Sequence, residues 1–429
     1  MRKDTPWART RGVWWRVLAV ALPLFAVLCL SKPAHAYSWM IRHGYSGCPV
    51  CHADPSGGET LTAYGRAQSD LLLRMRYDGK NPEEAEPSSA AGFLWFADLP
   101  ASVLLGGSVR VASSYSKASQ STPTTGTAAA DSSAKFAVFP MQLDLYGQLR
   151  FGSVTFGGSL GVIKTPAGSL YGRTSQITKN QNEAYNVISR THYIGYDINN
   201  EFTLRAGRLN LPFGVRIPEH TMWVRSTTRT DRESGQEHGV ALAYNAETMR
   251  GELMAILGNY QINPDAFRER GYSGYLELMA GARAGVGVST FYTYAKRDRV
   301  SKETNIARGA HGAFARLAVA DPFAILTEAD LLTDSTRALG YVGYLQGDYE
   351  FIQGLHGMLT LEWQDQGQEK SHAVSTDPAT QRKVPGAGKG EAGVWISANW
   401  FFLPHLDLRT DAIIRPGTFT LFTQLHAFL

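Results

Sequence analysis

The sequence predicts an all-β outer-membrane barrel of about 16 antiparallel strands, preceded by a small α-helical segment near the N-terminus. Three observations lead to this fold class. Polar and apolar residues alternate along most of the chain after residue 101. Long and short connections alternate between these runs. After residue 36, the sequence contains no apolar run of the roughly 18 residues that a membrane-spanning helix requires.

The alternation has the period of two residues that is typical of β-strands. In the run 141–151, Met141, Leu143 and Leu145 lie on one face, while Gln142 and Asp144 lie on the other. The runs 355–364, 392–402 and 406–411 alternate in the same way, and Asp, Glu or Arg occur on some of the polar faces. Charged side chains suit a water-filled lumen better than a dry sandwich core. The pattern favours a barrel, and a soluble periplasmic β protein is the alternative.

The candidate strands number about 16. They begin near residues 101, 134, 153, 187, 201, 236, 247, 271, 284, 307, 323, 338, 354, 390, 405 and 418. Connections after odd strands are long, at 118–133, 165–186, 213–235, 260–270, 297–306 and 367–389, except for short ones at 334–337 and 416–417. Connections after even strands are tight turns such as Asn199-Asn200 and Gln353-Gly354. Long loops at one end and short turns at the other are typical of outer-membrane barrels.

The last strand runs to the final residue of the sequence. Phe419, Leu421, Leu425, Ala427 and Leu429 share one face of it. This ending resembles the terminal assembly signal of outer-membrane barrels, although Leu429 stands where Phe is usual. We therefore expect the barrel assembly machinery and outer-membrane lipid to be partners.

The N-terminus predicts export from the cytoplasm. A basic region is followed by an apolar run of 14 residues, Val17 to Leu30, and then by Ala34-His35-Ala36. The apolar run is shorter than the roughly 20 residues of a membrane-spanning helix, so residues 1–36 are predicted to be a cleaved signal peptide. We divide the remaining chain into a segment at 37–77, a polar linker at 78–100 and the barrel at 101–429. The net charge of only +4 gives no indication of nucleic-acid binding.

The segment 37–77 contains the motif Cys48-Pro49-Val50-Cys51-His52. C-x-x-C-H is the attachment sequence for c-type haem. It predicts one covalent haem c, bound through thioethers to Cys48 and Cys51, with His52 as the proximal ligand of the iron. A redox dithiol would need a βαβ context, and a structural zinc site would need four ligands. Neither accompanies this motif.

The sixth ligand of the iron stays open at this point. Met75 and His43 are the candidate distal ligands, Met40 is a weaker one, and the iron could also be five-coordinate. Residues 60–75 are predicted to form a helix that begins at Thr60 and places Met75 on its apolar face. Three arginines of the segment are candidates for binding the haem propionates: Arg42, Arg66 and Arg74.

The order of these parts resembles the fused monohaem cytochrome–porin family, outer-membrane proteins of iron-oxidising bacteria. The likeness includes the motif at 48–52, the following run Leu61-Thr62-Ala63-Tyr64-Gly65-Arg66 and the porin-like stretch 206–214. It implies electron transfer from an extracellular donor, for which Fe(II) is one candidate, to a periplasmic c-type cytochrome or other carrier. The protein would then be an electron carrier, or an oxidoreductase such as an iron oxidase.

Electron transfer across the membrane requires the haem to lie within the barrel. The apolar band of an outer-membrane barrel is about 25 Å tall, so a haem on the periplasmic side would not reach an outside donor. A segment of this length also buries little surface by itself. We therefore expect residues 37–77 to occupy the lumen. The alternatives are a diffusion porin with a periplasmic haem module and an enzyme that uses His43 beside an open iron position.

Overall fold

The computed structural model describes residues 39–43, 47–55, 57–77, 99–118, 134–164, 174–180, 185–370 and 390–429. The predicted signal peptide and nearly all of the predicted linker lie outside these residues. Among the helices that are described, none combines the length and the apolar character needed to span a bilayer.

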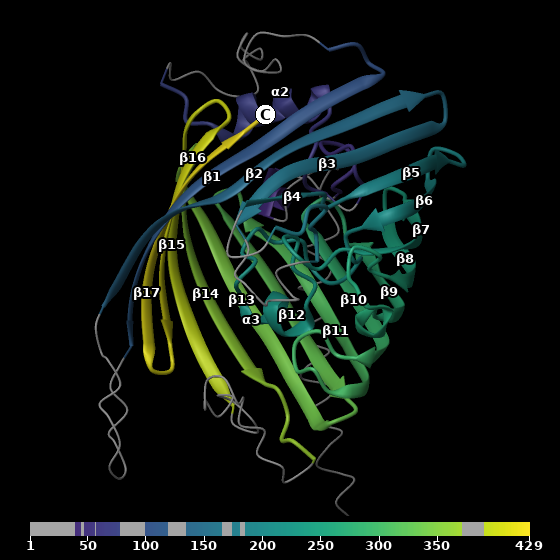
Figure 1. The fold of residues 1–429 in the computed structure, drawn as a ribbon. Coiled ribbons are helices and arrows are strands. Elements are labelled where there is room, and N and C mark those ends of the chain that lie inside the picture. Colours follow the sequence, from purple (N-terminus) through teal and green to yellow (C-terminus); the bar gives the residue numbers. More distant parts are fainter. Residues whose placement is uncertain are drawn as a thin grey trace, which may run out of the picture.

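Antiparallel strands form a closed barrel (Figure 1). Apart from β4 and β5, each strand pairs with the next along the chain, and β1 also pairs with β17. The strands are β1 (Val103–Ala118), β2 (Lys135–Phe151), β3 (Val154–Lys164), β4 (Tyr185–Ile188), β5 (His192–Asp197), β6 (Phe202–Leu209), β7 (Glu237–Asn245), β8 (Met249–Gly258), β9 (Arg270–Met279), β10 (Ala284–Arg297), β11 (Thr304–Ala320), β12 (Phe323–Asp334), β13 (Arg337–Ile352), β14 (Leu355–Asp365), β15 (Glu391–Leu403), β16 (Leu406–Arg415) and β17 (Thr418–Phe428). Both β4 and β5 pair with β3, at successive positions, so they are one strand interrupted at 189–191 and the barrel has sixteen strands.

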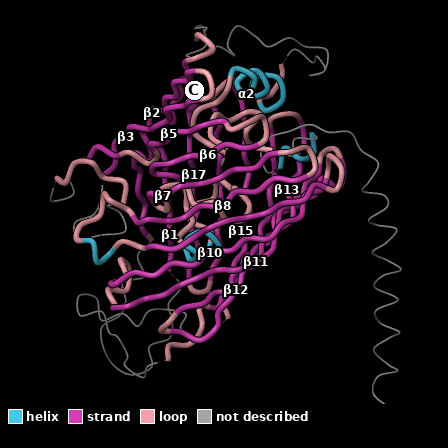
Figure 2. Tube along the Cα trace, turned by 90° about the vertical axis from the view of Figure 1, so that its right-hand side faces the viewer, coloured by secondary structure: helices cyan, strands magenta, loops and turns pink. Residues whose placement is uncertain are grey.

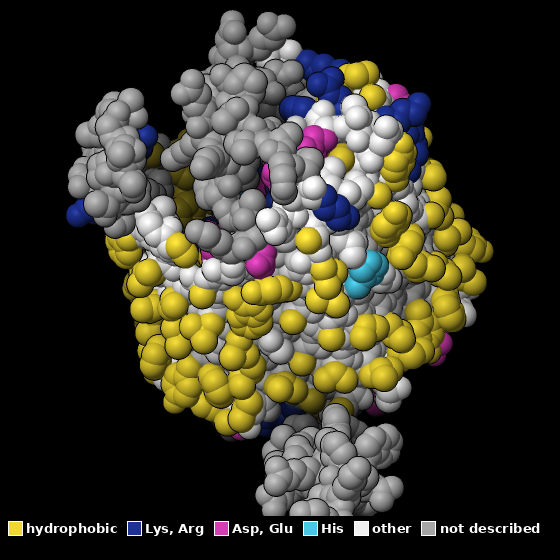
Figure 3. Space-filling view, turned by 90° about the horizontal axis from the view of Figure 1, so that it is seen from below, with side chains coloured by type: hydrophobic (Ala, Val, Ile, Leu, Met, Phe, Trp, Pro, Cys, Tyr) yellow, Lys and Arg dark blue, Asp and Glu magenta, His cyan; other side chains and the backbone are white. Residues whose placement is uncertain are grey.

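The predicted strands are confirmed. Each predicted start lies within three residues of an observed one. The faces are also as expected, because Leu145 is 62% exposed on the outer wall, whereas its neighbour Asp144 is 1% exposed in the lumen. Figure 3 shows hydrophobic side chains spread over the outer wall. The strands run obliquely across the wall, as they do in closed barrels (Figure 2).

The two ends of the barrel differ. The tight turns, such as those that join β2 to β3, β13 to β14 and β15 to β16, lie at one end of the barrel, which we call the short-turn end. The C-terminus and α2 (Ala63–Gln68) lie at the same end (Figure 1). The opposite end carries the connections predicted to be long, and we call it the long-loop end. In outer-membrane barrels short turns face the periplasm and long loops face outward.

Within the part of the chain that the structure describes, two pieces occupy much of the lumen. One is the N-terminal segment, with η1 (Trp39–His43), α2 and η2 (Ser69–Leu73). The other is the connection 210–236, which contains α3 (Trp223–Thr228) and which we call the inserted loop. A further short helix, η6 (Asp265–Phe267), lies in the connection before β9. The two lumenal pieces share a buried core with the wall: Met40, Ile41, Cys51, Leu73, Ile217, Met222, Val224, Phe314, Tyr344 and Phe401 all belong to it.

The predicted helix at 60–75 is shorter than expected and begins later. Its N-cap is Thr62, whose hydroxyl accepts a hydrogen bond from the amide of Gly65 at 3.0 Å. The α-helix covers Ala63–Gln68 and continues as a π-helix over Ser69–Leu73. Thr60 does not cap the helix because its carbonyl accepts a hydrogen bond from the amide of Ala53. Pairing with the motif thus keeps residues 60–62 extended.

Candidate functional site

The C-x-x-C-H motif forms a tight turn. The amides of Cys51 and His52 both donate to the carbonyl of Cys48, at 3.3 and 3.0 Å. His52 forms an antiparallel bridge with Leu61, and the amide of Thr62 donates to the carbonyl of Cys51 at 2.9 Å. These bonds hold the motif against the start of α2.

Two glycines allow the chain to pass close to the motif. Gly57 has a φ of +80°, and a Cβ there would lie 3.0 Å from the Cβ of Cys48 and 3.1 Å from its sulfur. Gly65 lies in the first turn of α2, where a Cβ would collide with the carbonyl of Cys51. Close packing against the motif therefore explains why the run Tyr64-Gly65-Arg66 has a glycine at its centre. Arg66 donates from one guanidinium nitrogen to the carbonyls of Leu61 and, on β1, Leu105.

The motif lies inside the lumen and is bonded to the barrel wall. The sulfur of Cys48 lies 3.5 Å from a guanidinium nitrogen of Arg250 on β8. Asp54 pairs with Arg205 on β6, which is itself paired with Glu252 on β8. The buried Arg205 lies between two carboxylates, one from the segment and one from the wall. These two ion pairs attach the segment to the barrel wall. The described part of 37–77 thus occupies the lumen at the short-turn end.

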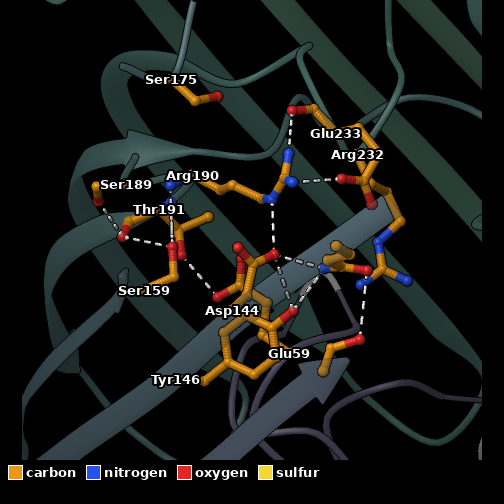
Figure 4. A network of polar contacts seen from close by, with 12 residues as sticks. Glu59, Asp144, Tyr146, Ser159, Ser175, Ser189, Arg190, Thr191, Arg232 and Glu233 are labelled. Carbon is orange, nitrogen blue, oxygen red and sulfur yellow. Dashed lines mark hydrogen bonds and ion pairs between the residues drawn. The ribbon is translucent and has the colours of Figure 1, made fainter. Parts of the chain in front are cut away.

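A second set of polar contacts fastens the next residues (Figure 4). The carboxylate of Glu59 accepts a hydrogen bond from the hydroxyl of Thr191 at 2.6 Å. Close by, Arg190 donates to Asp144 at 2.8 Å and pairs with Glu233 of the inserted loop at 2.7 Å. Wall, inserted loop and N-terminal segment therefore meet in one network.

Two small cavities adjoin the motif. The first, the Cys48 cavity, has a volume of about 110 Å³ and is lined by both polar and apolar residues. The second, the Cys51 cavity, has about 20 Å³ and is mostly apolar. Their linings share the side chains of His52, Leu61 and Phe428. His52 therefore borders both the cavity beside Cys48 and the cavity beside Cys51.

A third cavity, the lumen channel, has a volume of about 420 Å³. It shares Arg110, Pro218, Arg232 and His426 with the Cys48 cavity. At its other end it is lined by Arg415 and Thr418, beside the β16–β17 hairpin at the long-loop end. The channel therefore leads from the long-loop end toward the motif.

Burial sets the protonation of the motif. Loss of water raises the pKa of the Cys51 thiol to about 12, with Cys48 as a second cause. Burial, followed by the charge of Arg232, lowers the pKa of His52 to about 4. At neutral pH the site therefore offers a neutral thiol and a neutral imidazole, which is the form of histidine that binds metals.

The donor chemistry of the site fits a c-type haem, whereas the present space is small. Cys48 and Cys51 are both free thiols, and the imidazole lies on the cavities that adjoin them. Ligand pockets usually measure about 300–1,000 Å³, and neither cavity alone has this volume. The macrocycle would therefore need to occupy both cavities, whose linings share Leu61 and Phe428, and extend toward the lumen channel. Within the described ranges, no cluster of three or more His, Cys, Asp or Glu residues is arranged to hold a metal ion.

The two predicted distal ligands lie away from these cavities. The Nε2 atom of His43 is 4.0 Å from Glu350, and the amide of Met75 donates to the carbonyl of Phe401 at 2.7 Å. Neither residue lines the Cys48 or Cys51 cavity. Met40, 2% exposed, lines the Cys51 cavity together with His52. The available sequence signal was its place in the short apolar run Trp39-Met40-Ile41, within the same segment as the motif.

The arginines near the motif are not those expected. Arg42 pairs with Glu350 at 2.8 Å and Arg74 with Asp70 at 2.6 Å, while Arg66 binds carbonyls as described. The Cys48 cavity is instead lined by Arg110 from β1 and by Arg216 and Arg232 from the inserted loop. No spacing in the sequence links these residues to the motif, because folding alone brings them there.

Comparison with solved structures shows the fold. A loop-deletion mutant of OmpT, an outer membrane protein of Vibrio cholerae, is similar with a TM-score of 0.51 and 10% identity over 76% of this chain and 99% of its own. OmpT from the outer membrane gives 0.51 and 8% over 78% and 99%. An anion-selective porin from Comamonas acidovorans gives 0.50 and 11% over 76% and 99%. No protein-family model and no curated protein sequence matches the chain. The chain thus has the fold of outer-membrane porins.

Proposed function

We propose that this barrel is an outer-membrane electron-transfer protein with one covalent haem c. Cys48 and Cys51 hold the haem, and His52 is the proximal ligand. Electrons pass from an extracellular donor, Fe(II) being one candidate, to a periplasmic c-type cytochrome or other carrier. The observation that carries the proposal is the position of the C-x-x-C-H turn inside the lumen, bonded to wall residues such as Arg250.

This position suits transfer across the membrane. The motif lies at the short-turn end, where a periplasmic carrier would dock, and the lumen channel approaches it from the long-loop end. A small donor that enters the channel could come close to the haem edge without crossing lipid. The bound haem would supply one-electron chemistry, and the buried, mostly apolar surroundings of His52 would help to set its potential.

The residues of the segment have separate tasks in this proposal. The two thiols tether the cofactor covalently, and the neutral imidazole of His52 binds the iron. The bridge between His52 and Leu61 positions the backbone of His52 relative to α2. Asp54, through Arg205, keeps the whole segment from leaving the lumen.

The test is haem content of the purified barrel after expression with c-type maturation. The wild type should give a c-type pyridine haemochrome spectrum with one haem per chain, and a redox titration should show a single one-electron centre. The C48A/C51A variant should fold but lose covalent haem, whereas C48A alone should retain at most one thioether. A wild-type barrel without covalent haem would overturn the proposal.

A diffusion porin with a haem module is the second candidate, and the lumen channel is the observation that favours it. Conductance in planar bilayers separates the two. With the segment and the inserted loop in the lumen, a plugged conduit should conduct far less than an open porin. A large steady conductance in haem-loaded protein would favour the diffusion porin.

A further inference from the structure

The Cys48 cavity carries an excess of positive charge. Among the side chains of its lining are three guanidinium groups, those of Arg110, Arg216 and Arg232, and one carboxyl group, that of Glu59. Leu429, the last residue of the sequence, also lines the cavity. Removal from water, followed by the charge of Asp54, raises the pKa of Glu59 to about 7. At neutral pH this carboxyl group is therefore only partly ionised and compensates part of the charge.

Two of these arginines differ from most other buried arginines of the lumen. Arg190, Arg205, Arg225, Arg299, Arg308, Arg316 and Arg409 each pair with a carboxylate. Arg208 is bonded to backbone carbonyls, among them those of Ser189 and Thr174. Within the described part of the chain, no ion pair is formed by Arg110 or Arg232, and the Nε atom of Arg110 is buried without a hydrogen bond. The neighbouring carboxylate, Glu233, is already paired with Arg190.

The arginines also have a fixed place relative to the motif. The guanidinium of Arg232 lies against Gly58, where a Cβ would collide with it. Arg110 projects from β1. Arg216 comes from the inserted loop, which connects β6 to β7 in the sequence and packs into the barrel core. Cys48 belongs to the N-terminal segment, so the cavity brings the motif together with guanidinium groups from the wall and the inserted loop.

A c-type haem has a matching asymmetry. Its vinyl-derived carbons bond to the two cysteines, and its two propionate carboxylates lie on the opposite edge of the macrocycle. Guanidinium groups bind carboxylates bidentately, and unpaired charges away from bulk water are costly for both partners. We propose that Arg110, Arg216 and Arg232 form the site that holds the haem propionates. This inference rests on the proposed function and adds which residues, from outside the haem segment, bind and tune the cofactor.

The experiment compares midpoint potentials of haem-loaded R110Q, R232Q and R110Q/R232Q with that of the wild type. Positive charge near the haem disfavours the ferric state. Each loss of charge should therefore shift the ferric/ferrous equilibrium by roughly tenfold toward ferric, which is a fall of about 59 mV for a one-electron couple. The charge-conserving R232K should restore most of the wild-type potential.

R337Q is the matched control. Arg337 lies at the long-loop end, paired with Glu369 at 3.3 Å, and should leave the potential unchanged when replaced. Full haem content with unchanged potentials in R110Q, R232Q and the double variant would overturn the inference but not the proposed function. Absence of haem in the wild type would overturn the proposed function itself. If the double variant does not fold, the difference in midpoint potential between R232Q and R232K tests the inference instead.

Discussion

The sulfur of Cys48 lies 3.5 Å from a guanidinium nitrogen of Arg250, a residue of strand β8. The motif and the barrel wall are therefore in direct contact, although many residues separate them in the sequence. Arg250 is itself paired with Glu277 on β9. The N-terminal segment is thus an integral part of the lumen rather than a separate module.

The buried triad Asp54–Arg205–Glu252 should hold the segment in the barrel. D54N removes one of two carboxylates around a buried guanidinium, which costs about 3–5 kcal/mol in comparable buried pairs. We expect the segment to undock, so that limited proteolysis from the short-turn side cleaves within residues 37–77 faster than in the wild type. D265N is the control, because Asp265 forms exposed pairs with Arg268 and Arg270. Equal cleavage of D54N and wild type would contradict this role.

Gly65 should be intolerant of a side chain. In G65A the new Cβ collides with the Cys51 carbonyl, so α2 must shift away from the motif at a cost of about 1–3 kcal/mol. We expect slower or incomplete haem attachment, measured as the ratio of haem to protein. G147A is the matched control, because a Cβ there meets only Leu105 at 3.8 Å. Full haem content in G65A would show that the close packing is not needed.

The three candidate distal ligands can be separated by substitution. Met40 is the one that lines a cavity with His52, so M40L should change the oxidised visible spectrum and lower the potential, because methionine ligation raises it. M40L keeps the side-chain volume and should cost less than about 1.5 kcal/mol in stability. M75L and H43A should leave the spectrum as it is. A spectral change in either of those, with M40L unchanged, would assign the ligand differently.

Docking of the segment should depend on pH through Glu59. Its pKa is raised from 4.5 to about 7 in the folded state, so the folded state binds the proton more tightly than the unfolded one. Stability then falls as pH rises from about 4.5 to about 7, by at most about 3 kcal/mol. Protease protection of the segment should be greater at pH 5 than at pH 8. E59Q should remove most of this dependence, and an unaltered pH profile in E59Q would exclude Glu59 as the cause.

Much of the barrel could be predicted because its strands obey a local rule. A residue such as Leu145 faces lipid, and its neighbour Asp144 faces the lumen. This alternation of apolar and polar residues can be read from the sequence. The short turns are equally local. The interruption of one strand into β4 and β5 could not be predicted, since it depends on contacts made around Arg190 and Thr191.

The candidate site divides along the same line. The grouping of Cys48, Cys51 and His52 follows from the local sequence, because the covalent chain holds these three residues together within one run of five. The residues that surround them are set by the three-dimensional fold. Arg110, Arg216, Arg232 and Phe428 reach the motif because the barrel closes around it and the inserted loop folds inward, and Thr62 replaces Thr60 as the helix cap because residues 60–62 pair with the motif. The neighbours of the motif and the position of the helix cap depend on long-range packing, which no local sequence pattern encodes.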